Sequence, residues 1–255
     1  MTELATNNHQ QPLQILYQDE HCIAINKPAG MLVHRSWLAK HETTFVLQTL
    51  RDQIGQLVYP VHRLDRPTSG VLLFALNSES AKHFSQAFEQ HQVHKTYLAV
   101  VRGYMPTEQG SIDYPLSVIR DKIADKHSIA NTDTKPDQPA QTDWQLIDST
   151  EQPFAARARY KTSRYSLIKL CPTTGRKHQL RRHLKHIFHP IIGDTSYGDH
   201  HQNRAIRAHI GVSRLMLHAH TLTFTNIDGE RITAQAQVDE DWQKMLEDFN
   251  WKYHF

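Results

Sequence analysis

Short apolar stretches separated by turn residues run along most of this 255-residue chain, and they restrict its fold more than any other feature. Residues 14–26 have the pattern of a hairpin, because Ile15 and Tyr17 alternate with glutamines before a polar turn. Further strands are predicted over residues 71–76, 96–101, 144–147, 165–170 and 215–224, and helices over residues 43–54, 78–91, 175–187 and 239–249. Strands therefore outnumber helices and are joined mostly by turns or short helices. We expect an α+β fold with a mixed, largely antiparallel β-sheet core and flanking helices.

The predicted helices carry recognisable ends and faces. Gly55 is expected to stop the first helix, and Ser78 and Asp239 are expected to open the second and the last. In the helix predicted over residues 175–187, an apolar stripe has Arg181 at its edge, and Arg182 and Lys185 point toward solvent. This stripe comprises Leu180, Leu184, Ile187 and Phe188. An arginine at the margin of a buried face can reach a buried carboxylate while its stem packs on apolar surface.

The domain organisation is simple. Residues 1–12 are polar and are expected to form a flexible N-terminal tail. They lack the apolar core of a signal peptide. Residues 121–142 are polar, contain Pro136 and Pro139, and are expected to form a mobile loop. No linker interrupts the remainder, so residues 13–255 are predicted to form a single catalytic domain.

Basic residues are concentrated in one part of the chain. Between residues 152 and 193 there are ten Lys or Arg residues and no Asp or Glu, although the formal net charge of the whole chain is only +3. The other 19 basic residues are outnumbered by all 26 acidic residues, so the rest of the chain carries a formal charge of −7. A basic stretch on an otherwise acidic protein is typical of a surface that binds nucleic acid. The alternative is a solvated face that is basic by chance.

Residues 62–70, with the sequence HRLDRPTSG, place the single carboxylate of Asp65 between Arg63 and Arg66. Apolar runs at residues 57–59 and 71–74 flank this segment, which predicts a loop beside a sheet, where catalytic groups tend to lie. Nearby positive charge favours the ionised form of a carboxylate, so we expect Asp65 to be held ionised by arginines. The alternative interpretation is an ordinary surface salt bridge.

This segment resembles the signature H-R-L-D-x-x-T-S-G of the RluA-type pseudouridine synthases, and all seven specified positions are matched. The resemblance implies that Asp65 is the catalytic residue. It also implies that Arg63 stacks where the target base had been and that His62 contacts the displaced nucleotide. Thr68 is added to the expected substrate-binding residues.

Two later segments are similar to the other motifs of this family. Residues 95–103, KTYLAVVRG, match the second motif, which implies that Tyr97 stacks on the target base and acts as a base late in the reaction. By pattern alone Tyr97 is a half-buried strand residue. A phenol has a pKa of about 10, so it needs a neighbouring cation or network to accept a proton. The third motif, T-G-R-x-H-Q-L-R, begins at Thr174 and implies a salt bridge between Arg181 and Asp65.

The third motif also supplies four candidates for contact with the substrate. They are Arg176, Lys177, His178 and Arg182. The resemblance continues to Gly198, with one departure. Many members of the family have a glycine where this chain has Phe188, and we expect that change to affect helix packing more than chemistry.

The family isomerises uridine in RNA: the N1–C1′ bond breaks, the base turns, C5 bonds to C1′, and the C5 proton leaves. The resemblance therefore implies an isomerase without a cofactor, and the chain has no P-loop or dinucleotide fingerprint. Residues 33–37 and 121–126 resemble a branch of the family that modifies tRNA, with the target at nucleotide 65 in the acceptor stem. The alternatives are a synthase that acts on ribosomal RNA and an RNA-binding protein without catalysis.

Other classes of protein fit the sequence poorly. The 19 histidines suggest a metallohydrolase, but those near His183 lack H-E-x-x-H spacing and have no nearby carboxylate, so we expect no metal. Cys22 and Cys171 form no C-x-x-C pair and are expected to be free thiols in a reducing cytoplasm. The sequence contains no apolar run of about 18 residues, so no membrane span is predicted. We expect a cytoplasmic monomer whose partner is RNA.

Overall fold

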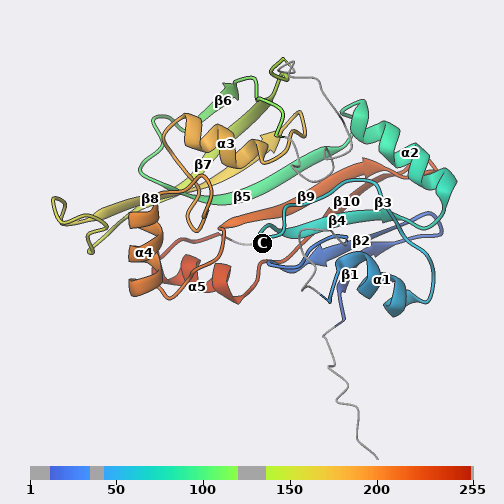
Figure 1. Cartoon of the computed structure of the whole chain (residues 1–255), viewed down its shortest axis with the longest axis horizontal. Helices are drawn as coiled ribbons and strands as arrows, with labels where there is room; N and C mark the ends of the chain where they lie inside the picture. The colour runs from blue at the N-terminus through green and yellow to red at the C-terminus, as the bar shows by residue number, and fades with distance from the viewer. Residues whose placement is uncertain (1–11, 35–42, 120–135, 254–255) are drawn as a thin grey trace, which may run out of the picture.

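The computed structural model describes residues 12–34, 43–119 and 136–253. Its strands are β1 (Gln14–Gln18), β2 (Cys22–Lys27), β3 (Tyr59–Pro60), β4 (Ser69–Ala75), β5 (His94–Arg102), β6 (Gln109–Asp113), β7 (Gln141–Gln152), β8 (Ser163–Pro172), β9 (Leu217–Thr225) and β10 (Arg231–Gln235). They form one sheet in the order β1-β2-β4-β9-β5-β8-β7-β6, with β3 beside β4 and β10 beside β9 (Figure 1). Within this described part, β4 and β9 pair in parallel and the other strand pairs are antiparallel. The predicted α+β fold with a mixed, largely antiparallel sheet is confirmed.

Helices cover both faces of the N-terminal half of the sheet. The helices of the described chain are α1 (Val46–Ile54), α2 (Ser78–Glu89), α3 (Gln179–His186), α4 (His200–His209) and α5 (Glu240–Asp248). Side chains of β2 alternate between the two faces, as the period of two in a strand requires. Ile23 and Ile25 belong to the cluster that contains Leu50 of α1, whereas Cys22 and Ala24 belong to the cluster that contains Phe84 of α2.

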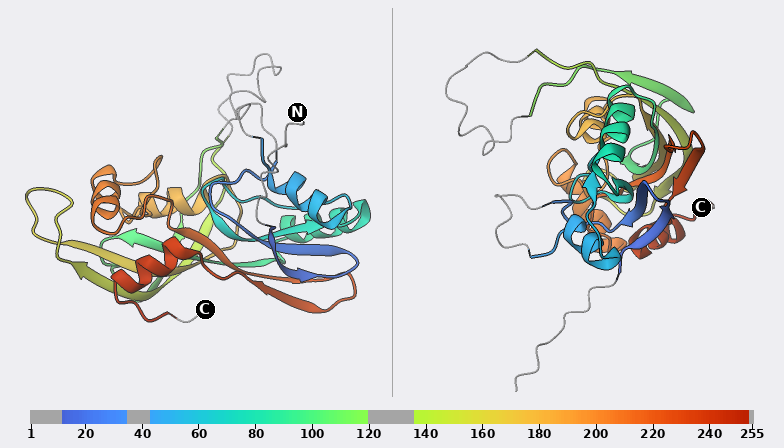
Figure 2. Two further views of the ribbon diagram at one scale, coloured as in Figure 1. Left: turned by 90° about the horizontal axis from the view of Figure 1, so that it is seen from below. Right: turned by 90° about the vertical axis from the view of Figure 1, so that its right-hand side faces the viewer.

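A larger core fills the other half of the molecule, where α3, α4 and α5 pack against β5 and β8 (Figure 2). The helices contribute Leu184, Ile206 and Trp242, all of which are almost completely buried. This core fixes α3 relative to the middle of the sheet. It therefore places the third sequence motif beside the first.

Several predicted element boundaries are confirmed and one cap is different. Gly55 ends α1 in the left-handed conformation with φ of +70°, and the Asp239 side chain caps α5. The cap of α2 is Asn77 rather than the predicted Ser78, because the Asn77 side chain accepts the backbone N–H of Ser80. Asn at this position satisfies a helix donor that has no partner within the helix.

The helix predicted over residues 175–187 is shorter than expected, which is a correction to the sequence analysis. The Gln179 side-chain oxygen accepts from the Thr174 hydroxyl and the Arg176 backbone N–H, and His178 has φ of +57°. These contacts hold residues 174–178 as a turn, so α3 begins at Gln179. Arg176, Lys177 and His178 consequently lie before the helix and not on its face.

Phe188 was also placed wrongly on the apolar stripe. It is 78% exposed and has φ of +65°. The backbone N–H groups of Phe188 and His189 donate to the carbonyls of Lys185 and Leu184, which is the Schellman arrangement that ends many helices. Glycine is usual at this position because it adopts positive φ without steric cost.

Other elements were not predicted. Helix α4 follows Asp199, whose side chain accepts two backbone N–H groups, and Ala205 and Ile206 are its buried residues. Strand β10 follows the Asp228-Gly229 pair, a sequence that favours hairpin turns. The loop predicted over residues 121–142 ends early, because Gln141 and Thr142 already belong to β7 and pair with β6. Residues 121–135 of this predicted loop, which include the segment 121–126, lie outside the described residues, as do the N-terminal residues 1–11.

None of the helices in the described ranges is long and apolar enough to cross a membrane.

Candidate active site

The loop that carries Asp65 is tied to the one parallel strand pair of the described sheet. The Thr68 backbone N–H donates to the Asp65 carbonyl at 3.0 Å, and β4 begins at the next residue. Gly70 pairs with Ala219 of β9 and has φ of +108°. A Cβ atom at Gly70 would lie 2.1 Å from the Ala219 carbonyl oxygen. The glycine of the first motif is therefore required by the close approach of two backbones.

Lys27 holds the backbone of this loop through hydrogen bonds, and the sequence analysis did not identify this role. Its side chain is fully buried, and Nζ donates to the carbonyls of Pro28, Arg66 and Thr68 at 2.8, 3.1 and 2.8 Å. Burial lowers the pKa of Lys27 to about 7. The three carbonyl acceptors match the three N–H donors of the ammonium, which is the form of Lys27 below pH 7. The signal in the sequence was a lysine at the end of a strand whose first four residues, Cys22 to Ile25, are apolar.

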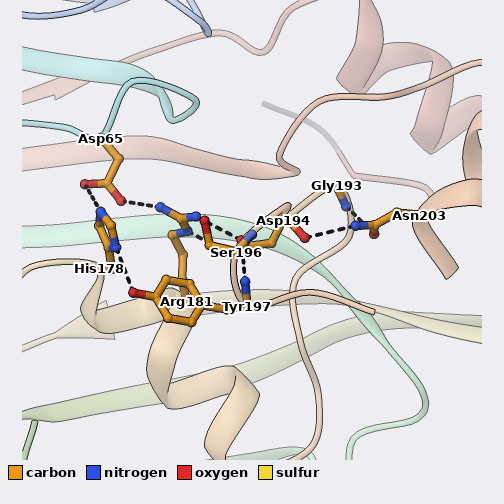
Figure 3. A network of polar contacts seen from close by, with 8 residues as sticks. All are labelled: Asp65, His178, Arg181, Gly193, Asp194, Ser196, Tyr197 and Asn203. Atoms are coloured by element: carbon orange, nitrogen blue, oxygen red, sulfur yellow. Dashed lines mark hydrogen bonds and ion pairs between the residues drawn. The ribbon is translucent and has the colours of Figure 1, made fainter. Parts of the chain in front are cut away.

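A buried arginine contacts the Asp65 carboxylate (Figure 3). Arg181 Nη1 lies 3.1 Å from Asp65 Oδ2, while Nε and Nη2 bind Asp194 at 2.7 and 2.9 Å. The Asp194 carboxylate is 1% exposed and also accepts the backbone N–H groups of Ser196 and Tyr197. These hydrogen bonds and the Arg181 charge keep the pKa of Asp194 below its usual value against the effect of burial. Asp194 therefore fixes the guanidinium that faces Asp65.

The arginines beside Asp65 in the sequence have different positions from those expected. Arg63 is exposed at the mouth of the pocket, and Arg66 Nε donates to the Gly30 carbonyl at 2.8 Å. The ion pair that the described structure gives Asp65 with an arginine comes from Arg181. The partner is the residue that the third motif implied, 116 positions away, and not Arg63 or Arg66.

His178 is the second side chain beside the Asp65 carboxylate. Its Nε2 lies 3.7 Å from Asp65 Oδ1, and its Nδ1 lies 2.9 Å from Tyr197 Oη. Burial lowers the pKa of His178, and the charges of Arg181 and Lys177 lower it further, although the charge of Asp65 opposes this. The lowered pKa favours the neutral ring of His178 at pH 7.

Tyr97 reaches the same site from β5. It pairs with Ala219 of β9, which in turn pairs with Gly70, so three adjacent strands bring Tyr97 close to the Asp65 loop. Burial, with the added charge of Asp65, raises the pKa of Tyr97 above its ordinary value. The phenol is therefore protonated at neutral pH. At that pH it offers an aromatic face and a hydrogen-bond donor, and the late role as a base that the resemblance implies requires its proton to be removed first.

His62 is bound to the protein itself. Its Nε2 accepts the Leu73 backbone N–H at 2.9 Å, and its ring stacks on Phe88 with the centroids 4.5 Å apart. Burial, followed by the charge of Lys95, lowers the pKa of His62 to about 3. The neutral ring therefore holds the start of the loop in place. His62 also lines the pocket.

One pocket with a volume of about 490 Å³ collects most of the residues predicted for the site. Eight of them line it: His62, Arg63, Asp65, Thr68, Tyr97, Arg176, His178 and Arg181. Lys177 and Arg182 are outside this lining, and Arg182 donates two hydrogen bonds of 2.9 Å to Ser117. Lys95, which was not predicted, adds a further cation to the wall. The pocket has the size of a site for one nucleotide-sized group.

Within the described ranges, no three His, Cys, Asp or Glu side chains are grouped as ligands of a metal ion. Cys22 and Cys171 are free thiols. Most of residues 33–37, one of the two segments that resemble the tRNA-modifying branch, lies outside the described ranges.

The fold and this site together define a pseudouridylate synthase domain. The solved structure of human RNA Pseudouridylate Synthase Domain Containing 4 superposes with a TM-score of 0.69 at 24% identity and covers 93% of each chain. The sequence profile described as RNA pseudouridylate synthase matches residues 21–186, which is more than half of the chain.

Two relatives match over nearly their whole length. The tRNA pseudouridine synthase C of Pasteurella multocida is 61% identical over 240 residues, which are 94% of this chain and 97% of the relative. The protein of the same name from Haemophilus influenzae is 59% identical over 241 residues, 94% of this chain and 99% of the relative. This chain belongs to the RNA pseudouridylate synthase family and is an isomerase that makes pseudouridine.

Proposed function

We propose that this protein converts one uridine of tRNA, at nucleotide 65, into pseudouridine, with Asp65 as the catalytic residue. The observation that carries the proposal is the Asp65 carboxylate in the pocket, with Arg181 Nη1 at 3.1 Å. The choice of tRNA is supported by the name that the two relatives share, tRNA pseudouridine synthase C. The same name supports nucleotide 65 as the target.

The reaction needs one ionised carboxylate. Asp65 either attacks C1′, so that the N1–C1′ bond breaks, or removes the C2′ proton to give a glycal. In both routes the base then turns and C5 bonds to C1′; this displaces the Asp65 carboxylate from C1′ in the first route and is accompanied by return of the proton to C2′ in the second. The C5 proton then leaves, and N1 takes up a proton. Glycosidases need a second carboxyl group because they also activate water and protonate a leaving group. Asp194 is 1% exposed and fully engaged by Arg181 and backbone N–H groups, which supports a holding role for it rather than a second chemical one.

The geometry also suggests how the nucleotide enters. A base that is paired inside an RNA helix is out of reach of the pocket, so the enzyme has to flip it out of the helix at a cost of a few kcal/mol. Arg63 is exposed at the pocket mouth, where its planar guanidinium can stack in the space that the base leaves. Tyr97 lines the same pocket and offers an aromatic face to the everted base. Arg176 and Lys95 supply positive charge for the phosphates around it.

The test compares Asp65→Asn with Asp228→Asn, which changes an exposed carboxylate in the turn between β9 and β10. Tritium release from tRNA that carries 5-tritiated uridine measures turnover. Mapping of the modified nucleotide in tRNA and ribosomal RNA from a deletion strain measures the target. We expect Asp65→Asn to lose about a thousandfold or more in rate while it still binds tRNA, and Asp228→Asn to match the wild type.

Three results would contradict the proposal. Pseudouridine formation by Asp65→Asn at close to the wild-type rate would remove Asp65 from the chemistry. Loss of a ribosomal pseudouridine from the deletion strain, with tRNA unchanged, would replace tRNA as the substrate. A protein that binds RNA and releases no tritium would be a binding protein without catalysis.

A further inference from the structure

Tyr197 contacts both side chains that face the Asp65 carboxylate (Figure 3). Its hydroxyl lies 2.9 Å from His178 Nδ1, and the Arg181 guanidinium carbon lies 5.1 Å from the centre of its ring. The Tyr197 backbone N–H donates to Asp194 Oδ1 at 2.9 Å. One short segment, residues 194–197, therefore holds two different groups against Asp65.

The two groups face different oxygens of the same carboxylate. Arg181 Nη1 binds Oδ2 at 3.1 Å, and His178 Nε2 faces Oδ1 at 3.7 Å. The second distance is longer than a hydrogen bond but short enough for an electrostatic contact that tightens with a small movement. A carboxylate with one donor group at each oxygen has a defined rotation about its last bond. That rotation decides which oxygen lone pair faces the nucleotide.

The backbone at His178 has an uncommon conformation, with the ring between Asp65 and Tyr197. Its φ of +57° is in the left-handed region, which residues other than glycine rarely adopt. The Gln179 side chain fixes the turn through Thr174 and the Arg176 backbone N–H. Unusual backbone conformations that the surroundings enforce occur often at functional sites.

Hydrogen-bond bookkeeping decides which nitrogen of His178 carries the proton. The neutral imidazole has one N–H group, and the ionised Asp65 carboxylate can only accept. The Tyr197 hydroxyl can donate or accept. All three groups are satisfied when Tyr197 donates to Nδ1 and Nε2–H faces Asp65. The opposite tautomer would direct a lone pair of Nε2 toward a negative oxygen.

We propose that Tyr197 fixes the Nε2–H tautomer of His178 and thereby makes His178 a positioning residue that, together with Arg181, sets the orientation of the Asp65 carboxylate. The proposal rests on the proposed function of Asp65. It assigns His178 a role different from contact with the substrate.

Two substitutions at His178 separate this role from a purely conformational one. In His178→Gln, the side-chain NH₂ can reach the position of Nε2, whereas in His178→Asn it reaches only the position of Nδ1. Asn adopts the left-handed conformation more readily than Gln. If the N–H toward Asp65 matters, Gln keeps kcat within about tenfold of the wild type, and Asn loses about a further tenfold, with KM similar in both. An Asn variant as active as or more active than the Gln variant would overturn the proposal.

A second measurement needs no substrate and no turnover. ¹⁵N chemical shifts of the His178 ring in the full-length protein report the tautomer directly. We expect Nε2–H in the wild type, loss of the single tautomer in Tyr197→Phe, and a fall in kcat of about tenfold for that variant at unchanged KM. The control is Tyr104→Phe, which changes an exposed tyrosine whose hydroxyl is 3.5 Å from Glu151.

The Nδ1–H tautomer in the wild-type protein would refute the proposal even if a His178 variant failed to fold. Failure of the proposed function has a different signature, which is full activity of Asp65→Asn. The tautomer can be correct in that case, and the two conclusions are therefore tested separately.

Discussion

Replacing Lys27 with Met tests whether a buried ammonium holds the Asp65 loop. Met keeps most of the apolar stem and removes the donors to the carbonyls of Pro28, Arg66 and Thr68. The Arg66 carbonyl also accepts the Gly30 backbone N–H at 2.9 Å, so it keeps a donor. The buried bond to the Thr68 carbonyl and the partly buried bond to the Pro28 carbonyl are therefore the ones that Lys27→Met leaves unreplaced.

The magnitude follows from these contacts. The buried Thr68 carbonyl without a donor costs about 1–3 kcal/mol, and the Pro28 carbonyl adds less because Pro28 is exposed and water can replace the lost donor. Removal of the buried charge offsets part of this cost. We expect Lys27→Met to lower the free energy of unfolding by about 1–4 kcal/mol at pH 7. The activity should fall as well, because the Thr68 carbonyl belongs to the loop that presents Asp65.

The pH dependence gives a second, independent readout. The pKa of Lys27 is lowered to about 7 in the folded protein, from 10.5 in the unfolded chain. Between these values the unfolded chain binds more protons, so this group makes the wild-type protein more stable as the pH rises, by up to about 1.4 kcal/mol per unit. Lys27→Met lacks this contribution, and its deficit against the wild type should therefore grow from pH 7 to pH 9.

Urea unfolding at several pH values, together with tritium release, provides the assay. The control is Lys82→Met, which changes an exposed lysine of α2. The reasoning is refuted if Lys27→Met is as stable and as active as the wild type. A deficit that stays constant between pH 7 and pH 9 would contradict the lowered pKa of Lys27.

Two further predictions concern the charges around the pocket. Arg181→Ala should lower the activity by about a hundredfold or more and change the pH profile of kcat, because Asp65 loses its partner. Measurements of the rate against pH check this. An unaltered profile would contradict the role of the salt bridge. Changing Lys177, Arg182 and Lys185 together to Gln should weaken tRNA binding and make the negative slope of log K against log salt shallower by up to about 3. Filter binding at several salt concentrations measures this slope. An unchanged slope would show that RNA binds to another surface.

Local patterns in the sequence were sufficient for much of the fold. The alternation in β2, the glycine after α1 and the cap of α5 each depend on residues close together in the chain, and the structure agrees with them. The motifs supplied more. They implied that Arg181 meets Asp65, and the two side chains lie 3.1 Å apart.

Local patterns failed where side chains compete with the regular hydrogen bonds of a helix. The segment 174–178 has helical spacing, but the Gln179 side chain takes the Arg176 backbone N–H and holds a turn instead. Phe188 fits an apolar stripe on a helical wheel, but the helix has already ended and the side chain is 78% exposed. Helical periodicity does not contain this information.

The sequence by itself determined the sheet-forming segments and the carboxylate at the centre of the site, because alternation and motif spacing are properties of neighbouring residues. Only the tertiary structure decided which cations and acids meet. Lys27 holds the loop, Asp194 holds Arg181, and Tyr197 holds His178, all through the packing of β4, β9 and α3. Many residues of the right charge were available, and strand register and burial selected these.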